Sequence, residues 1–179
     1  MRRINLAVVI GIFVCFLLHA VMGSLKLAGA TVNTMKNVGY AGVALIAVHV
    51  LLTLILTART LKARRMSGVG YFRGNGLFWA RRISGLAILI PLVMHLLIFG
   101  NGNTGACRLK VFTMGRLISQ VLLVLTIALH AFLNMKPMLL GLGVRSHRAF
   151  RADLFVILSC MLLLFGAAFV WYYLRWMAY

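Results

Sequence analysis

The chain alternates five long apolar runs with short polar connections rich in Lys and Arg. The runs cover residues 5–22, 38–58, 83–100, 117–135 and 154–174 approximately. A helix needs roughly 17 to 25 apolar residues to cross the hydrocarbon core of a bilayer. Because that core offers no water to unpaired backbone groups, such runs must be helical. The pattern predicts an all-α integral membrane protein, a five-transmembrane-helix bundle forming one domain over residues 1–179.

The composition supports a membrane protein and excludes several other classes. Hydrophobic residues make up 63% of the chain and charged residues 11%, which leaves too little polar surface for a water-soluble domain. The net charge of +18 would suggest nucleic-acid binding in a soluble protein, but here the basic residues lie between apolar runs, so membrane topology explains them and no nucleic-acid partner is expected. The cysteines lack any CxxC or CxxCH spacing, which argues against a disulfide framework, a cysteine-ligated cluster and c-type haem; they are Cys15, Cys107 and Cys160.

The distribution of Lys and Arg predicts a cytoplasmic N-terminus. The N-terminal residues and the second and fourth connections carry 13 of the 19 basic residues, and the opposite side carries 6. An excess of Lys and Arg marks the cytoplasmic side of a membrane. The first run also resembles a secretory signal in its basic start, but no clear A-x-A cleavage site follows it. We therefore interpret it as a membrane span, with cleavage as the alternative.

Histidines are the informative residues of these runs. The first four runs contain one each, namely His19, His49, His95 and His130, whereas His147 falls in the fourth connection. Ionisable side chains inside a membrane span are costly and usually face the bundle interior with a partner. A single one could be a neutral imidazole bonded to a neighbouring helix. Four together, in spans otherwise poor in ionisable groups, indicate a ligand bound between the helices.

Depth in the membrane predicts how the histidines pair. His19 and His95 lie beyond the midpoints of two outward-running helices, by roughly 9 and 6 Å at about 1.5 Å per residue. His130 lies on the cytoplasmic side of its midpoint and His49 near the middle, so the inner half suits this pair best. Two pairs on facing helices match the axial ligands of two bis-histidine haems. Zinc or a di-metal centre would favour clustered ligands with carboxylates, and the spans contain no such cluster.

One stretch carries a family resemblance. "RRISGLAILIPLVMH" has a basic residue, then Ser84-Gly85, then a histidine ten residues after the glycine. With five helices and one histidine on each of the first four, the chain resembles the cytochrome b membrane anchor of the succinate dehydrogenase/fumarate reductase family, in its five-helix, two-haem form. The resemblance implies two haem b groups, an outer one held by His19 and His95 and an inner one held by His49 and His130.

The same resemblance implies a function and partners. An anchor of this family transfers electrons between a membrane quinone, typically menaquinone, and an iron–sulfur subunit and a flavoprotein subunit on one membrane face. The chain itself would do no chemistry on the carbon substrate. The implied location is the bacterial cytoplasmic (inner) membrane, and the direction of the reaction stays open.

Further residues are candidates for cofactor contacts. Ser84 and Gly85 could admit a haem edge or serve a small-residue helix contact. Haem propionates favour basic and aromatic side chains near the interface, although ordinary interfacial anchoring would place the same residues there; the candidates are Trp79, Arg82 and Lys136 inside and Lys26 and Arg116 outside. Pro91, one turn before His95, should bend its helix and could orient that histidine.

A quinone site is harder to place. The chain has no Glu and a single Asp, Asp153, whose position at the start of the fifth run suits helix capping. The polar residues near the outer end of the fourth run, Ser119 and Gln120, are the candidates for quinone contact.

Two other functions remain open. One is the cytochrome b anchor of a different flavin-linked complex or of a hydrogenase or formate dehydrogenase. The other is a haem-free small transporter or scaffold whose histidines serve packing or proton movement.

Overall fold

Five helices form the part of the chain that the structure describes. The computed structural model describes residues 2–32, 35–66, 75–100, 111–144 and 148–178. Within these ranges there is no strand, and each helix is long and apolar enough to cross a membrane. In chain order the helices are α1 (Arg2–Leu27), α2 (Lys36–Met66), α3 (Gly76–Phe99), α4 (Met114–Gly141) and α5 (Arg148–Met177).

The predicted apolar runs form the centres of these helices. Every run lies inside its helix, except that α3 ends at Phe99 and Gly100 follows as its C-cap. The helices are longer than the runs because polar and basic residues continue the backbone hydrogen bonding past the apolar stretch. The clearest case is α2, which continues beyond the end of its apolar run at residue 58 as far as Met66, through a basic segment.

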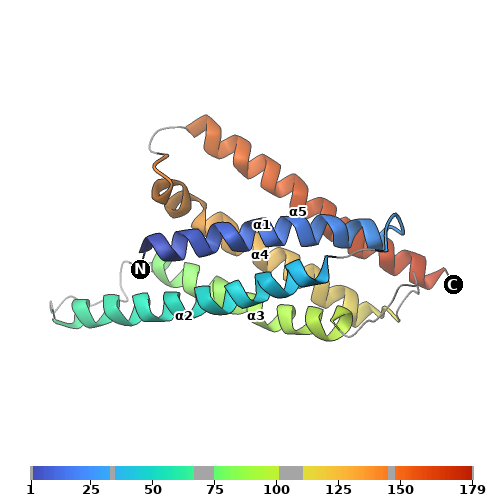
Figure 1. The fold of residues 1–179 in the computed structure, drawn as a ribbon, viewed down its shortest axis with the longest axis horizontal. Coiled ribbons are helices and arrows are strands. Elements are labelled where there is room, and N and C mark those ends of the chain that lie inside the picture. Colours follow the sequence, from blue (N-terminus) through green and yellow to red (C-terminus); the bar gives the residue numbers. More distant parts are fainter. Residues whose placement is uncertain (1, 33–34, 67–74, 101–110, 145–147, 179) are drawn as a thin grey trace.

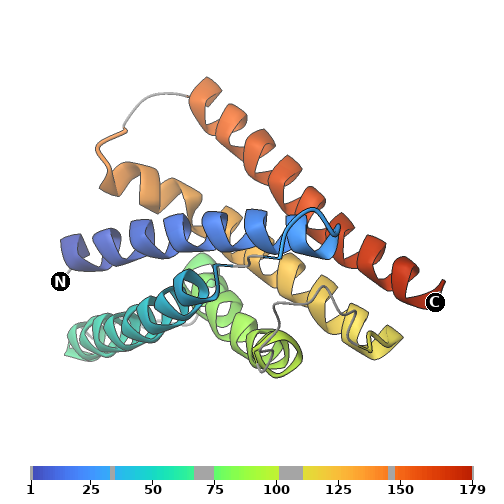
Figure 2. The same ribbon diagram turned by 45° about the vertical axis from the view of Figure 1, so that its right-hand side comes forward.

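The helices associate as two pairs with a fifth helix beside them. α1 packs along α2, and α3 packs along α4, while α5 contacts α4 and α1 (Figures 1 and 2). Among the described residues, no Cα atom of α1 lies within 8 Å of one in α3, and none of α2 lies that close to α4. Between the two pairs, α1 and α4 come close at the backbone, whereas α1 with α3 and α2 with α4 meet through side chains alone in the described part of the chain.

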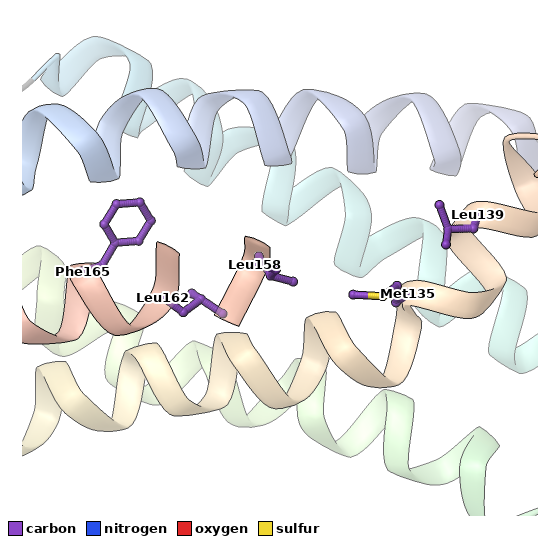
Figure 3. Packing of buried hydrophobic residues seen from close by; sticks show 5 residues of the cluster. All are labelled: Met135, Leu139, Leu158, Leu162 and Phe165. Atoms are coloured by element: carbon purple, nitrogen blue, oxygen red, sulfur yellow. The ribbon is translucent and has the colours of Figure 1, made fainter. Parts of the chain in front are cut away.

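The main hydrophobic core lies between α4 and α5. Figure 3 shows its buried members, Met135 and Leu139 from α4 and Leu158, Leu162 and Phe165 from α5. α1 joins this cluster through Phe16, whose ring meets that of Phe165 edge-on with 5.9 Å between centroids. A single surface of α5 thus packs against both α4 and α1.

A second, smaller cluster joins α3 to α5 near the outer end that the topology predicts. Ile98, Phe112 and Tyr172 are buried there, and Phe112 is fully buried. The rings of Phe112 and Tyr172 pack edge-to-face at 5.1 Å. Elsewhere large apolar side chains are exposed on every helix, as expected for surfaces that face lipid tails rather than water.

Two prolines lie inside helices. Pro91 is buried in α3, four residues before His95. Pro137 lies in α4, beyond the predicted run at 117–135, and the helix continues past it to Gly141. The α4 ribbon changes direction between Met135 and Leu139 (Figure 3). A proline without its N–H is the ordinary cause of such a bend.

Candidate functional site

The four span histidines meet in two pairs across the bundle. The ring of His19 on α1 lies 6.1 Å from that of His95 on α3, measured between centroids, with an interplanar angle of 84°. His49 on α2 and His130 on α4 lie 6.5 Å apart at 73°. Each pair joins helices whose backbones do not approach one another. These contacts are the same pairs that depth in the membrane predicts.

Three of the four imidazoles are held at Nδ1 by a polar side chain of another helix. His95 Nδ1 lies 2.7 Å from Gln120 Oε1, and His49 Nδ1 lies 2.9 Å from Asn5 Oδ1. A neutral imidazole that donates its Nδ1–H keeps a lone pair on Nε2. Metal-binding histidines commonly have this arrangement, in which the second ring nitrogen donates to a fixed acceptor. The amide oxygens of Asn5 and Gln120 are such acceptors.

The third imidazole, His130, is held by Ser84. The two atoms, Ser84 Oγ and His130 Nδ1, are 3.0 Å apart, and the same hydroxyl donates to the Arg81 carbonyl at 3.1 Å. Because the hydroxyl has one proton, its oxygen is then left to accept from His130 Nδ1–H. Asn134 donates from Nδ2 to the His130 carbonyl at 2.8 Å, and the same Nδ2 lies 3.4 Å from His130 Nδ1, so Ser84 and Asn134 both face this ring nitrogen.

Glycines on the neighbouring helices let two of the rings approach closely. A Cβ on Gly39 of α2 would lie 2.8 Å from His19 Nδ1, and a Cβ on Gly85 of α3 would lie 3.0 Å from His130 Cε1. His19 Nδ1 is buried and has no hydrogen-bond partner among the described residues. Each pair therefore has one ring seated on a glycine of a different helix.

The spacing of the rings in each pair matches what two histidines holding one haem iron would need. A metal midway between two imidazoles, about 2 Å from each nitrogen and so about 3 Å from each ring centroid, separates the centroids by about 6 Å. The observed separations are 6.1 and 6.5 Å. No three His, Cys, Asp or Glu side chains cluster in the described ranges. A haem iron needs only two protein ligands because its macrocycle fills the remaining positions, whereas a structural zinc needs four.

The candidate residues at the inner end lie on α3 and α4. Arg82 packs over the Phe78 ring at 3.3 Å and donates from Nε to Thr57 Oγ1 of α2 at 2.7 Å. Trp79 meets Phe78 edge-on at 5.4 Å. Lys136 is exposed on α4. The structure thus brings Ser84 and Gly85 against His130, while Arg82 links α3 to α2 one turn earlier.

The candidate residues at the outer end lie on α1 and α4. Lys26 is in the last turn of α1, and Arg116 donates to the Val111 carbonyl. Ser119 is half-buried and donates to the Arg116 carbonyl at 2.7 Å, whereas Gln120 is fully buried. Of this group, Gln120 is the residue that contacts a histidine pair.

Sequence reasoning missed two of the polar contacts around the histidines. Asn5 lies two residues after Arg3 and Asn134 two residues before Lys136, so each is at the polar end of its apolar run and nothing in the sequence sets it apart from its neighbours. Gly39 carries no signal either, because its role depends on which face of α2 meets α1. His147 and much of the basic connections lie outside the described residues.

Comparison with known proteins adds no further identification, since no family model, curated protein or solved structure matches this chain.

Proposed function

We propose that this chain is a dihaem cytochrome b membrane anchor of a succinate dehydrogenase/fumarate reductase type of complex. In this role it transfers electrons between a membrane quinone, such as menaquinone, and an iron–sulfur and a flavoprotein subunit. The observation that carries the proposal is the geometry of the two histidine pairs, at 6.1 and 6.5 Å between ring centroids. The resemblance of "RRISGLAILIPLVMH" to the haem-binding helices of that family supports the choice of complex.

The residues of the chain hold and separate the two sites. His19 and His95 would bind the outer haem, and His49 and His130 the inner haem. When bound, each haem supplies a one-electron redox centre. Gln120, Asn5 and Ser84 hold three of the rings at Nδ1, which would leave Nε2 of each ring to bind the iron.

The basic side chains suit the ends of such a protein. In the proposed orientation the N-terminus is cytoplasmic, in a bacterial inner membrane, and the exposed basic end of α2 faces the same side as the soluble partners. Arg82, Trp79 and Lys136 are candidates for the propionates of the inner haem, and Lys26 and Arg116 for those of the outer haem. A quinone that reaches the outer end of α4 would meet Ser119 before the fully buried Gln120.

The test is the reduced-minus-oxidised absorption spectrum of the purified full-length chain, together with its haem content. Two haem b per chain are expected. Absence of a b-type band would overturn the proposal and favour the haem-free transporter or scaffold. A band with one haem per chain would contradict the two-site assignment while leaving a cytochrome b.

The soluble partners need a separate test. Gentle solubilisation of tagged chain from its native membrane should co-purify a flavoprotein and an iron–sulfur protein that interconvert succinate and fumarate. Co-purification of a hydrogenase, a formate dehydrogenase or another flavin-linked enzyme would keep the dihaem assignment and replace the complex.

A further inference from the structure

Gln120 is the one fully buried polar side chain in the described part of the bundle. Its exposed fraction is 0%, and both ends of its amide are engaged. Oε1 lies 2.7 Å from His95 Nδ1, and Nε2 donates to Ser119 Oγ at 2.9 Å. An unpaired amide in such surroundings would be costly, so these two contacts fix the rotamer of the side chain.

The directions of these hydrogen bonds determine the tautomer of His95. The Arg116 carbonyl can only accept, so the Ser119 hydroxyl donates to it at 2.7 Å and its oxygen accepts from Gln120 Nε2. The amide therefore presents Oε1, an acceptor, to the imidazole. His95 Nδ1 must carry the proton, which leaves the lone pair on Nε2.

We propose that Gln120 is a positioning residue that holds His95 as the Nδ1–H tautomer and thereby sets the reduction potential of the outer centre. The second part of this statement rests on the proposed dihaem function, whereas the first depends only on the hydrogen-bond chain. An acceptor at Nδ1 increases the electron density of the ligating imidazole. Because the oxidised iron has the higher charge, this electron density would stabilise it more than the reduced iron. The Gln120 acceptor would therefore lower the reduction potential of the outer centre.

The outer pair is unusually dependent on this one residue. His19 Nδ1, on the other side of the pair, has no hydrogen-bond partner among the described residues. In the inner pair both rings have one, from Asn5 and Ser84. Loss of the Gln120 acceptor therefore removes the only such contact in the described part of the outer pair.

The first experiment is a redox titration of the purified wild-type chain and of Gln120→Leu, following the two haem absorption bands. Gln120→Leu should raise the potential of one centre and leave the other unchanged. Asn5→Leu should move the other centre instead. Thr126→Val serves as the matched control, because the Thr126 hydroxyl bonds only to backbone carbonyls of its own helix.

A merely structural role predicts a different pattern. If Gln120→Leu only loosened α4 against α3, both centres would shift or broaden together, and Thr126→Val would act in the same direction. Two haems with unchanged potentials in Gln120→Leu would overturn the inference. Ser119→Ala gives a milder variant that keeps Oε1 but frees the amide; a smaller upward shift of the same centre is expected, and no shift there would also count against the inference.

A second experiment does not depend on haem. Nitrogen-15 NMR of histidine-labelled full-length chain distinguishes the Nδ1–H from the Nε2–H tautomer. Wild-type His95 should be the Nδ1–H form, and Gln120→Leu should convert it to a mixture. A wild-type chain without haem would overturn the proposed function, but the NMR tautomer would still decide the role of Gln120. Finding the Nε2–H tautomer of His95 in wild type would overturn that role directly.

Discussion

Arg81 on α3 donates a hydrogen bond from Nε to the Leu133 carbonyl on α4, with 3.0 Å between the two atoms. Leu133 lies four residues before Pro137, so its carbonyl is the one that the proline leaves without a helical N–H donor. A freed carbonyl inside a membrane protein must find another partner. The guanidinium of the neighbouring helix is that partner, and it ties the bend of α4 to the start of α3.

This contact predicts a coupling between Arg81 and Pro137. Arg81→Met leaves the Leu133 carbonyl unpaired and should lower the free energy of unfolding by about 1–3 kcal/mol. In a Pro137→Ala background the new N–H can bond to Leu133 directly, so Arg81→Met should cost much less. The measurement is a double-mutant cycle of unfolding in mixed detergent micelles.

Arg82 provides the control for this cycle. Its guanidinium bonds to Thr57 and to the Phe78 carbonyl, away from the proline, so Arg82→Met should cost the same with and without Pro137. Equal costs of Arg81→Met in both backgrounds would show that its guanidinium does not replace the missing helical donor.

The proposed orientation can be tested by labelling. In a chain whose cysteines are replaced by Ser, Ala63→Cys at the basic end of α2 should be shielded from a membrane-impermeant maleimide in intact cells. Ala30→Cys, after the end of α1, should react. The reason is the excess of Lys and Arg on the side that holds residue 63. Labelling of residue 63 alone would reverse the orientation and place the soluble partners on the other face.

Loss of one histidine should remove one haem. If the chain has the proposed dihaem function, His95→Ala would leave the outer iron with a single protein ligand, while the inner pair keeps Asn5 and Ser84 as its supports. The expected haem content falls from two to about one per chain, read from pyridine haemochrome spectra. His49→Ala should remove the other haem, and His147→Ala neither. Full haem content in His95→Ala would contradict the pairing.

The sequence predicted the five spans because bilayer thickness and backbone satisfaction restrict such a chain to apolar helices of a set length. It also predicted the pairs His19 with His95 and His49 with His130, since depth along a helix follows from residue number alone. It did not reveal that Gln120 faces His95 or that Asn5 faces His49. Those contacts depend on the rotation of each helix about its axis, which the nearly uniform apolarity of these spans leaves undetermined.

The two glycines beneath the histidine rings yield a graded prediction. A Cβ at residue 39 would lie 2.8 Å from His19 Nδ1, too close for the ring to stay in place, so Gly39→Ala should displace His19 and lower the occupancy of the outer haem. At residue 85 the gap to His130 is 3.0 Å, which a small ring shift can relieve, so Gly85→Ala should shift the spectrum of the inner haem with less loss.

A third glycine separates ring displacement from any general effect of alanine on these helices. Nothing lies within 4 Å of a Cβ at Gly23 on α1, so Gly23→Ala should keep both haems and stabilise the helix by up to about 1 kcal/mol. The measurement is the haem content and thermal stability of all three variants, which distinguishes displacement of a histidine ring from a general effect of alanine on the helix. If Gly39→Ala behaves like Gly23→Ala, the His19 ring does not rest on residue 39 in the haem-bound protein, and the close approach of α1 to α2 must serve helix packing alone.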